Sequence, residues 1–212
     1  MRRGTPYRGL EDLRRDYARS RGRIRVRLKE FARVGQAEYF YELAYCLLTP
    51  QSSAVNAAKA VELLKQGDFL ATDFDPSQIL FRKEHYIRFH NTKARRLLEA
   101  KRNLPAILSA LASGGSPQEK RAWFVSHVKG LGWKEASHFL RNIGYRDLAI
   151  LDRHILRNLR RHRIIRALPA SLTPARYRLI EKKFRLFAED VGIPMDDLDL
   201  LFWSRETGEI LK

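Results

Sequence analysis

The 212-residue sequence has little cysteine and no long apolar run. Cys46 is the only cysteine, which excludes an intramolecular disulfide and any zinc or iron–sulfur site built from four cysteines. No stretch approaches the roughly eighteen apolar residues that a membrane span needs, and the start of the chain, Met1-Arg2-Arg3-Gly4, lacks the apolar segment of a signal peptide. We therefore expect an intracellular protein that does not enter a membrane, located in the cytoplasm or nucleoid if its source is a prokaryote.

Acidic residues are scarce beside basic ones. The chain has 24 Asp plus Glu against 41 Lys plus Arg, a net charge of +17 and a pI near 10.4. Such a charge favours a polyanionic partner, either a nucleic acid or an acidic membrane surface. The hydrophobic content of 44% is ordinary for a globular protein, and the length suffices for one domain or two small lobes.

The sequence also lacks clear β alternation and internal repeats. Apolar residues recur at helical spacing instead, as in the stripe Tyr177, Ile180, Phe184 and Phe187. The predicted fold class is therefore all-α.

Two of the predicted helices are joined by a short turn between residues 128 and 133. Ser116-Pro117-Gln118-Glu119 is a capping box with proline at the first helical position, and it predicts a helix from Pro117 to about Lys129. A second helix should follow the turn and end near Gly144. Both helices are supported by apolar residues at helical spacing, namely Phe124, Val128 and Leu131, then Trp133, Ala136, Leu140 and Ile143. The hairpin unit is predicted at about residues 117–143.

The turn itself contains Gly130 and Gly132. Glycine accepts the positive φ or crowded backbone of a tight reversal, and it leaves N–H groups uncovered at the start of a helix, where a phosphate binds well. A plain connector between packed helices would have the same sequence, so the glycines alone leave both interpretations open.

Lys134 lies in the first turn of the second predicted helix. The positive end of the helix dipole disfavours a protonated amine there. With an ordinary lysine pKa near 10.4, only about one molecule in a few thousand carries the free amine at neutral pH, so a nucleophilic lysine needs such an environment. This position makes Lys134 the candidate nucleophile.

Asp152 follows in the segment Ile150-Leu151-Asp152-Arg153-His154. An aspartate before a helix-like segment is a good N-cap, which is the structural interpretation. A carboxylate fixed as a cap is also held rigidly enough to face a reacting sugar, so the two roles are compatible.

Four segments resemble a known family. Gly130-Leu131-Gly132-Trp133-Lys134 with Leu151-Asp152-Arg153-His154 resembles the helix-hairpin-helix DNA glycosylases. Together with Arg88 to Ala94 and Trp203 to Lys212, the chain resembles the archaeal-type 8-oxoguanine DNA glycosylase/AP lyases over most of its length. The resemblance implies two helical lobes around a DNA-binding cleft, within a single helix-hairpin-helix glycosylase domain spanning residues 1–212.

The resemblance also implies a bifunctional enzyme of base excision repair. Lys134 would displace 8-oxoguanine, form a Schiff base with the sugar and nick the strand by β-elimination, while Asp152 would stabilise positive charge on the sugar. The expected partner is double-stranded DNA with an oxidised base, bound by a monomer. No metal or organic cofactor is expected, although family hairpins hold a monovalent cation through backbone carbonyls.

Further roles follow from the same resemblance. Phe89 and Trp203 would flank the extruded base, and Lys212 at the chain end would contribute to its recognition. Gln51 would fill the gap that the base leaves. The DNA backbone would be bound by Lys129, Gly130, Gly132 and Arg153.

Each assignment has a structural alternative. Phe89 is also a hydrophobic staple before a cap at Asn91, Trp203 a core residue, Lys212 a disordered end and Gln51 an ordinary loop residue. For the whole chain, the alternatives are lyase chemistry on another oxidised base or an abasic site, and a noncatalytic helix-hairpin-helix module that only binds DNA. An RNA-binding protein is disfavoured, because the sequence has no aromatic RNA-binding sheet motif.

Overall fold

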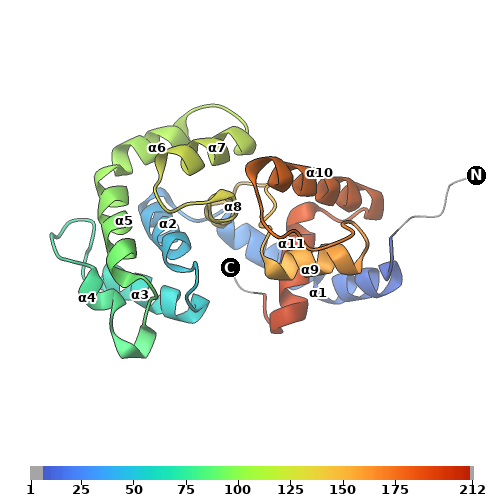
Figure 1. Ribbon diagram of the computed structural model, residues 1–212, viewed down its shortest axis with the longest axis horizontal. Helices are drawn as coiled ribbons and strands as arrows, with labels where there is room; N and C mark the ends of the chain where they lie inside the picture. Colours follow the sequence, from blue (N-terminus) through green and yellow to red (C-terminus); the bar gives the residue numbers. More distant parts are fainter. Residues whose placement is uncertain (1–6, 211–212) are drawn as a thin grey trace, which may run out of the picture. The chain divides into compact units, whose positions relative to one another are not determined.

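A computed structural model describes residues 7–210 and is helical throughout, with no β-strand in that range (Figure 1). The all-α prediction and the helix-hairpin-helix motif are confirmed. The helices are α1 (Leu10–Phe31), η1 (Gln36–Glu38), α2 (Tyr39–Leu48), α3 (Ala54–Gln66), α4 (Ser77–Leu80), η2 (Lys83–His85), α5 (His90–Arg102), α6 (Leu104–Ala112), α7 (Pro117–His127), α8 (Trp133–Asn142), α9 (Arg153–Arg161), α10 (Pro174–Val191) and α11 (Met195–Thr207). None of these helices has an apolar stretch long enough to cross a bilayer.

The chain divides into two compact units. One is continuous in sequence, from Val34 to Phe139, and is called the inserted unit. The other is called the split unit, because it combines the chain up to Arg33 with the chain from Leu140 onward. The change from one to the other falls within α8.

The inserted unit is built around α2. Eight of the ten residues of α2 are buried, which explains why its sequence is apolar on nearly every side. Helices α3 and α5 pack on α2, and α4 contacts both α3 and α5. The α3 helix begins at a Ser53 cap, whose hydroxyl accepts a hydrogen bond from the Asn56 N–H.

The split unit packs α1, α9 and α10 against α11 (Figure 1). The α10 helix begins with Thr173 as N-cap and Pro174 in the first turn, as those residues predict. Its apolar stripe is fully or nearly fully buried, at Tyr177, Ile180, Phe184 and Phe187. The stripe thus belongs to the core, as predicted.

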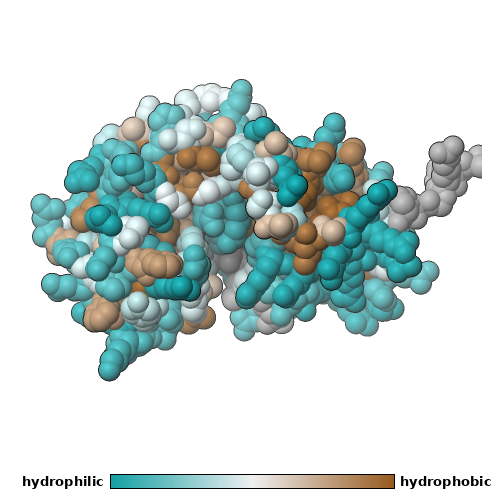
Figure 2. Space-filling view, in the orientation of Figure 1, coloured by the Kyte–Doolittle hydropathy of each residue, from teal (hydrophilic) through white to brown (hydrophobic). Residues whose placement is uncertain are grey.

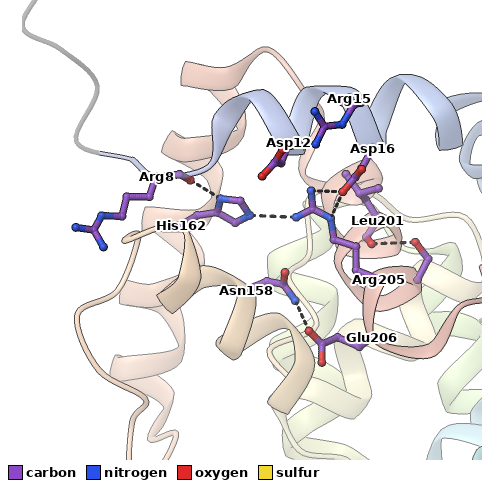
Figure 3. A network of polar contacts seen from close by, with 10 residues as sticks. Arg8, Asp12, Arg15, Asp16, Asn158, His162, Leu201, Arg205 and Glu206 are labelled. Carbon is purple, nitrogen blue, oxygen red and sulfur yellow. Dashed lines mark hydrogen bonds and ion pairs between the residues drawn. The ribbon is translucent and has the colours of Figure 1, made fainter.

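A polar network crosses the split unit beneath α1 (Figure 3). The buried His162 ring donates from Nδ1 to the Arg8 carbonyl at 2.7 Å, and its Nε2 lies 3.2 Å from the Arg205 guanidinium. Arg205 in turn pairs with Asp16 at 2.7 Å. Burial lowers the pKa of His162, and the Arg205 and Arg161 charges lower it further against the effect of the Arg8 carbonyl. The ring is thus accommodated in its neutral form.

The start of α5 differs from the expected cap. Asn91 was predicted to cap this helix, but α5 begins at His90 and the N-cap position belongs to Phe89. Phe89 has a left-handed backbone, with φ of 60°, and makes no side-chain cap. The prediction of Asn91 as cap is therefore wrong.

Polar side chains cover most of the face seen in Figure 2, with apolar atoms in scattered patches. This surface accords with the large excess of basic residues.

Candidate active site and nucleic-acid interface

The hairpin between α7 and α8 is shaped by Gly130. The α7 helix begins with the full capping box, in which the Ser116 hydroxyl accepts from the Glu119 N–H and the Glu119 carboxylate accepts from the Ser116 N–H. At Gly130 φ is +96°, and an added Cβ would lie 2.5 Å from Cδ of Arg96. Two features favour glycine at this position, namely the positive φ and the absence of room for a Cβ beside Arg96.

Gly132 directly precedes α8, and its carbonyl accepts from the Ala136 N–H at 2.9 Å. The Glu135 side chain folds back toward this residue, since an added Cβ on Gly132 would lie 2.9 Å from Glu135 Oε2. The contact is with the end of a flexible side chain, so the steric restriction at Gly132 is weaker than at Gly130.

Lys134 lies in the first turn of α8, as its sequence position predicts. About a third of its side chain is exposed, and Nζ lies 3.6 Å from Oε1 of Glu135. The amine is therefore attached to a rigid helix and remains accessible to a molecule in solution. That combination suits a nucleophile.

Arg121 supports the start of α8 from within. Its side chain is 1% exposed, it donates to the Ser137 hydroxyl at 3.1 Å, and its guanidinium lies 4.7 Å from the centre of the Trp133 ring. A cation over an indole face is a favourable contact, particularly away from water. Arg121 thus fixes the residue that precedes Lys134.

One face of α5 supports the rest of the interface in the inserted unit. Phe89, Lys93, Arg96 and Glu99 follow one another at intervals of four, three and three residues, which places them along one helical stripe. Arg96 underlies Gly130, and Glu99 pairs with the mostly exposed Lys129 at 2.9 Å. This helix therefore braces the hairpin at two successive positions.

Gln51 and Phe89 are both exposed and both have left-handed backbones, with φ of 57° and 60°. The Arg88 guanidinium lies 4.8 Å from the centre of the Phe89 ring. Phe89 occupies the N-cap position and is half exposed, so it does not act as the buried staple of a cap at Asn91.

In the split unit, Asp152 is the N-cap of α9. Its Oδ1 accepts from the Ile155 N–H at 2.8 Å, which confirms the capping interpretation. Its Oδ2 accepts from the indole N–H of Trp203 at 3.2 Å. The side chain is half-buried, and both of its oxygens are oriented by hydrogen bonds.

Trp203 therefore lies against the candidate catalytic carboxylate. The indole is part-exposed on α11, and its ring meets that of His154 edge-on at 6.2 Å. Arg153 is exposed beside them and donates to the His154 ring at 3.2 Å. The arrangement joins a predicted base-binding residue to the predicted aspartate, a contact that no sequence pattern indicated.

A buried carboxyl group lies behind this site. Asp199 of α11 is almost fully buried, 3.4 Å from the Arg141 guanidinium. Burial raises the pKa of Asp199 to about 7, while Arg141 lowers it and the charge of Asp152 raises it further. The two carboxyl groups are thus electrostatically coupled in the split unit.

The predicted residues fall into two groups. Gln51, Phe89, Lys129, Gly130, Gly132 and Lys134 belong to the inserted unit, whereas Asp152, Arg153 and Trp203 belong to the split unit. Lys212 lies outside the described residues. Sequence reasoning missed the supporting side chains Lys93, Arg96, Arg121 and Asp199, of which only the first two had a signal, the helical spacing from Phe89.

Comparison with known proteins identifies the family of this chain. The profile of the 8-oxoguanine DNA glycosylase family matches residues 24–193. A Fusobacterium nucleatum protein named 8-oxoguanine DNA glycosylase/AP lyase is 39% identical, covering 96% of this chain and 97% of its own. A Korarchaeum cryptofilum protein of the same name is 38% identical, covering 96% of this chain and 100% of its own.

Solved structures give the same result. The crystal structure of Tm1821, the 8-oxoguanine DNA glycosylase of Thermotoga maritima, has a TM-score of 0.84 and 32% identity, with 96% and 98% of the two chains covered. The Methanocaldococcus jannaschii 8-oxoguanine glycosylase/lyase, in complex with a 15mer DNA containing 8-oxoguanine, has a TM-score of 0.81 and 32% identity over 94% and 99%. This chain belongs to the 8-oxoguanine DNA glycosylase family.

Proposed function

We propose that the protein is a bifunctional DNA glycosylase/AP lyase that removes 8-oxoguanine from duplex DNA and then nicks the strand. The observation that carries the proposal is Lys134, an accessible amine in the first turn of the helix that follows the hairpin. The named relatives support the lesion, because they match nearly the whole chain.

Binding would depend on the DNA backbone. The hairpin N–H groups around Gly130 and Gly132, with Lys129 and Arg153, offer contacts to phosphates that do not depend on sequence. The net charge of +17 adds a long-range attraction for any duplex. The target nucleotide must then leave the stack, since its glycosidic bond is hidden inside the duplex.

The reaction starts with the free amine of Lys134, which attacks C1′ of the deoxyribose. The bond from C1′ to the base breaks, its electron pair leaves with the base, and the base takes up a proton. The nitrogen then loses one proton, the bond from C1′ to the ring oxygen breaks as the C1′=N bond of the Schiff base forms, and the ring oxygen takes up a proton. Loss of a C2′ proton drives departure of the 3′ phosphate, and water finally releases the lysine.

Asp152 is suited to oppose the positive charge that develops on the sugar. Its fixed orientation supports this role, because an already oriented carboxylate needs no rearrangement during the reaction. It would also help to position or deprotonate Lys134.

The base would be held by Phe89 and Trp203, with Lys212 contributing at the chain end. Gln51 would enter the gap in the duplex. We further propose a monomer that acts inside the cell. The chemistry requires no metal or organic cofactor, and a monovalent cation at the hairpin carbonyls stays a prediction on which no step depends.

Borohydride trapping tests the proposal on duplexes with 8-oxoguanine, thymine glycol or an abasic site. The protein should form a covalent adduct with 8-oxoguanine DNA, and Lys134→Gln should abolish it while the matched surface variant Lys59→Gln should not. Adducts only with the abasic duplex would show that the lesion assignment is wrong. Binding without any adduct would instead indicate a noncatalytic DNA-binding module.

A further inference from the structure

Two exposed side chains of the inserted unit have backbones that L-residues rarely adopt. Gln51 follows α2 and Phe89 precedes α5, with φ of 57° and 60°. A left-handed backbone costs a residue other than glycine roughly 1–2 kcal/mol. Neither side chain is buried, so packing of these side chains does not offset that cost.

A buried lysine stabilises the strained backbone conformation at Gln51. Lys93 of α5 is 2% exposed, and its ammonium donates to the carbonyls of Leu48 and Pro50 at 2.7 and 2.6 Å and to the Ser52 hydroxyl at 3.1 Å. These three oxygens flank Gln51 on both sides in the sequence. The contacts use all three hydrogens of the ammonium group.

The same group also fixes the turn at Phe89. The Ser52 hydroxyl that binds Lys93 also accepts from the Arg88 N–H at 3.0 Å, directly before Phe89. From the other side, the Phe89 carbonyl accepts from the Lys93 N–H at 3.0 Å within α5. The loop that carries Gln51 and the turn that carries Phe89 are therefore joined at one point.

Burial of the Lys93 ammonium group is unfavourable for the stability of the fold. The partners of the ammonium are uncharged oxygens, and burial together with the Arg96 charge lowers the pKa of Lys93 to about 8. A buried charge without a carboxylate partner is destabilising unless hydrogen bonds compensate for the lost water. The hydrogen bonds of the Lys93 ammonium all go to the segment from Leu48 to Ser52, and Ser52 joins this segment to the turn at Phe89. The evident effect of Lys93 is therefore to fix the geometry of the two turns.

We propose that Lys93 is a positioning residue that, through Ser52, holds the backbones of Gln51 and Phe89 in one fixed arrangement, in which Gln51 enters the duplex while Phe89 receives the extruded base. The inference rests on the proposed function. A backbone that is already fixed loses little conformational freedom when the side chains that it carries enter DNA, so more of their contact energy is available to offset unstacking of the base.

The proposal makes a distinction between substrates. Extruding an intact base requires unstacking and unpairing, whereas a preformed abasic site has no base to extrude. Lys93 should therefore matter for excision of 8-oxoguanine from a duplex and should matter little for cleavage at an abasic site. A lysine that only stabilised the fold would affect both reactions equally.

Single-turnover rates on these two duplexes test the inference, with Lys93→Met and Ser52→Ala as variants and Lys59→Met as a matched exposed-lysine control. We expect Lys93→Met to lose about tenfold or more in 8-oxoguanine excision, equivalent to about 1.4 kcal/mol. Its abasic-site cleavage should change less than about threefold, which is under about 0.7 kcal/mol. Ser52→Ala should shift the same ratio by a smaller factor, and Lys59→Met should leave it unchanged.

Equal losses on both duplexes, or no loss in either variant, would overturn the inference. Ser52→Ala keeps the lysine and removes only the bridging hydroxyl, so it decides the question if Lys93→Met fails to fold. A wild-type protein inactive on both duplexes would instead refute the proposed function, and the two failures are thereby distinguished.

Discussion

The two units fix their candidate functional groups in different ways. In the inserted unit, three of the candidates have positive φ, namely Gln51, Phe89 and Gly130, and side chains of α5 contact the turns that carry Gln51 and Gly130. In the split unit, Asp152 has an ordinary extended backbone and is oriented by hydrogen bonds to both of its oxygens. The inserted unit therefore fixes its candidate residues through the backbone conformation of its turns. The split unit instead fixes the orientation of the Asp152 carboxylate through hydrogen bonds.

Replacing that charge should have the largest effect. Asp152→Asn keeps an oxygen for the cap, and Asn caps about as well as Asp, so stability should change little. Loss of the carboxylate should slow single-turnover excision by roughly 10²–10⁴-fold. Asp73→Asn removes the same charge from a fully exposed side chain and is the control. Unfolding of Asp152→Asn with a matching loss of activity would mean that the cap alone matters.

The hairpin backbone should be the next most sensitive feature. Gly130→Ala introduces a strained φ and a contact 2.5 Å from Arg96, and should lower the free energy of unfolding by about 1–3 kcal/mol and weaken DNA binding. Gly114→Ala, with open space around its Cβ, should do neither. Adding Arg96→Ala to Gly130→Ala removes the steric contact but leaves the strain, so recovery should be partial. Thermal unfolding and fluorescence anisotropy give the two readouts, and full recovery would refute the role of φ.

A finer change tests the orientation of Asp152. Trp203→Phe removes the indole N–H and keeps an aromatic ring, and a hydrogen bond to a charged group is worth about 1.5–3 kcal/mol. Excision should slow by about tenfold or somewhat more. Trp123→Phe, on α7 where the part-exposed Trp123 stacks on His127, should have no effect. An unchanged rate in Trp203→Phe would leave the cap as the sole orienting contact.

The smallest effect concerns pH and the split unit alone. Because the folded-state pKa of His162 lies below its ordinary value of 6.5, the unfolded state binds more protons at acidic pH. The contribution of His162 to stability is therefore fully present above about pH 6.5 and is lost as the pH falls below that value. The raised pKa of Asp199 acts in the opposite direction over this range, so the contribution of His162 is measured as a difference between proteins. By denaturant unfolding, the wild type should lose stability relative to His162→Gln as the pH falls from 7.5 to 5.5, and it should not do so relative to the exposed control His127→Gln.

Features made by neighbouring residues were predictable from the sequence. The capping box at Ser116 and the cap at Asp152 each depend on residues three positions apart, and both are present. The prediction of a cap at Asn91 is wrong because the start of α5 is set by hydrogen bonds to Ser52 from Arg88 and Lys93. Ser52 lies 36 residues before Arg88 in the sequence. Local propensity cannot register such a contact.

The supporting side chains were harder to predict for a different reason. Lysine and arginine are almost never fully buried, so a sequence reading places Lys93 and Arg121 on the surface. The hydrogen bond between Asp152 and Trp203 joins residues 51 positions apart, and the resemblance identified each residue without indicating their contact.

The order of the units along the chain has a consequence for synthesis. The inserted unit is complete once residue 139 has been made, but α1 packs against α11, which begins at Met195. At about 5–20 residues per second, a ribosome leaves α1 without this partner for roughly 10–30 seconds. Its sequence suits that interval, because only Leu13, Ser20, Ile24, Leu28 and Phe31 become buried among many charged residues. A nascent helix of this composition exposes little apolar surface before the split unit has folded.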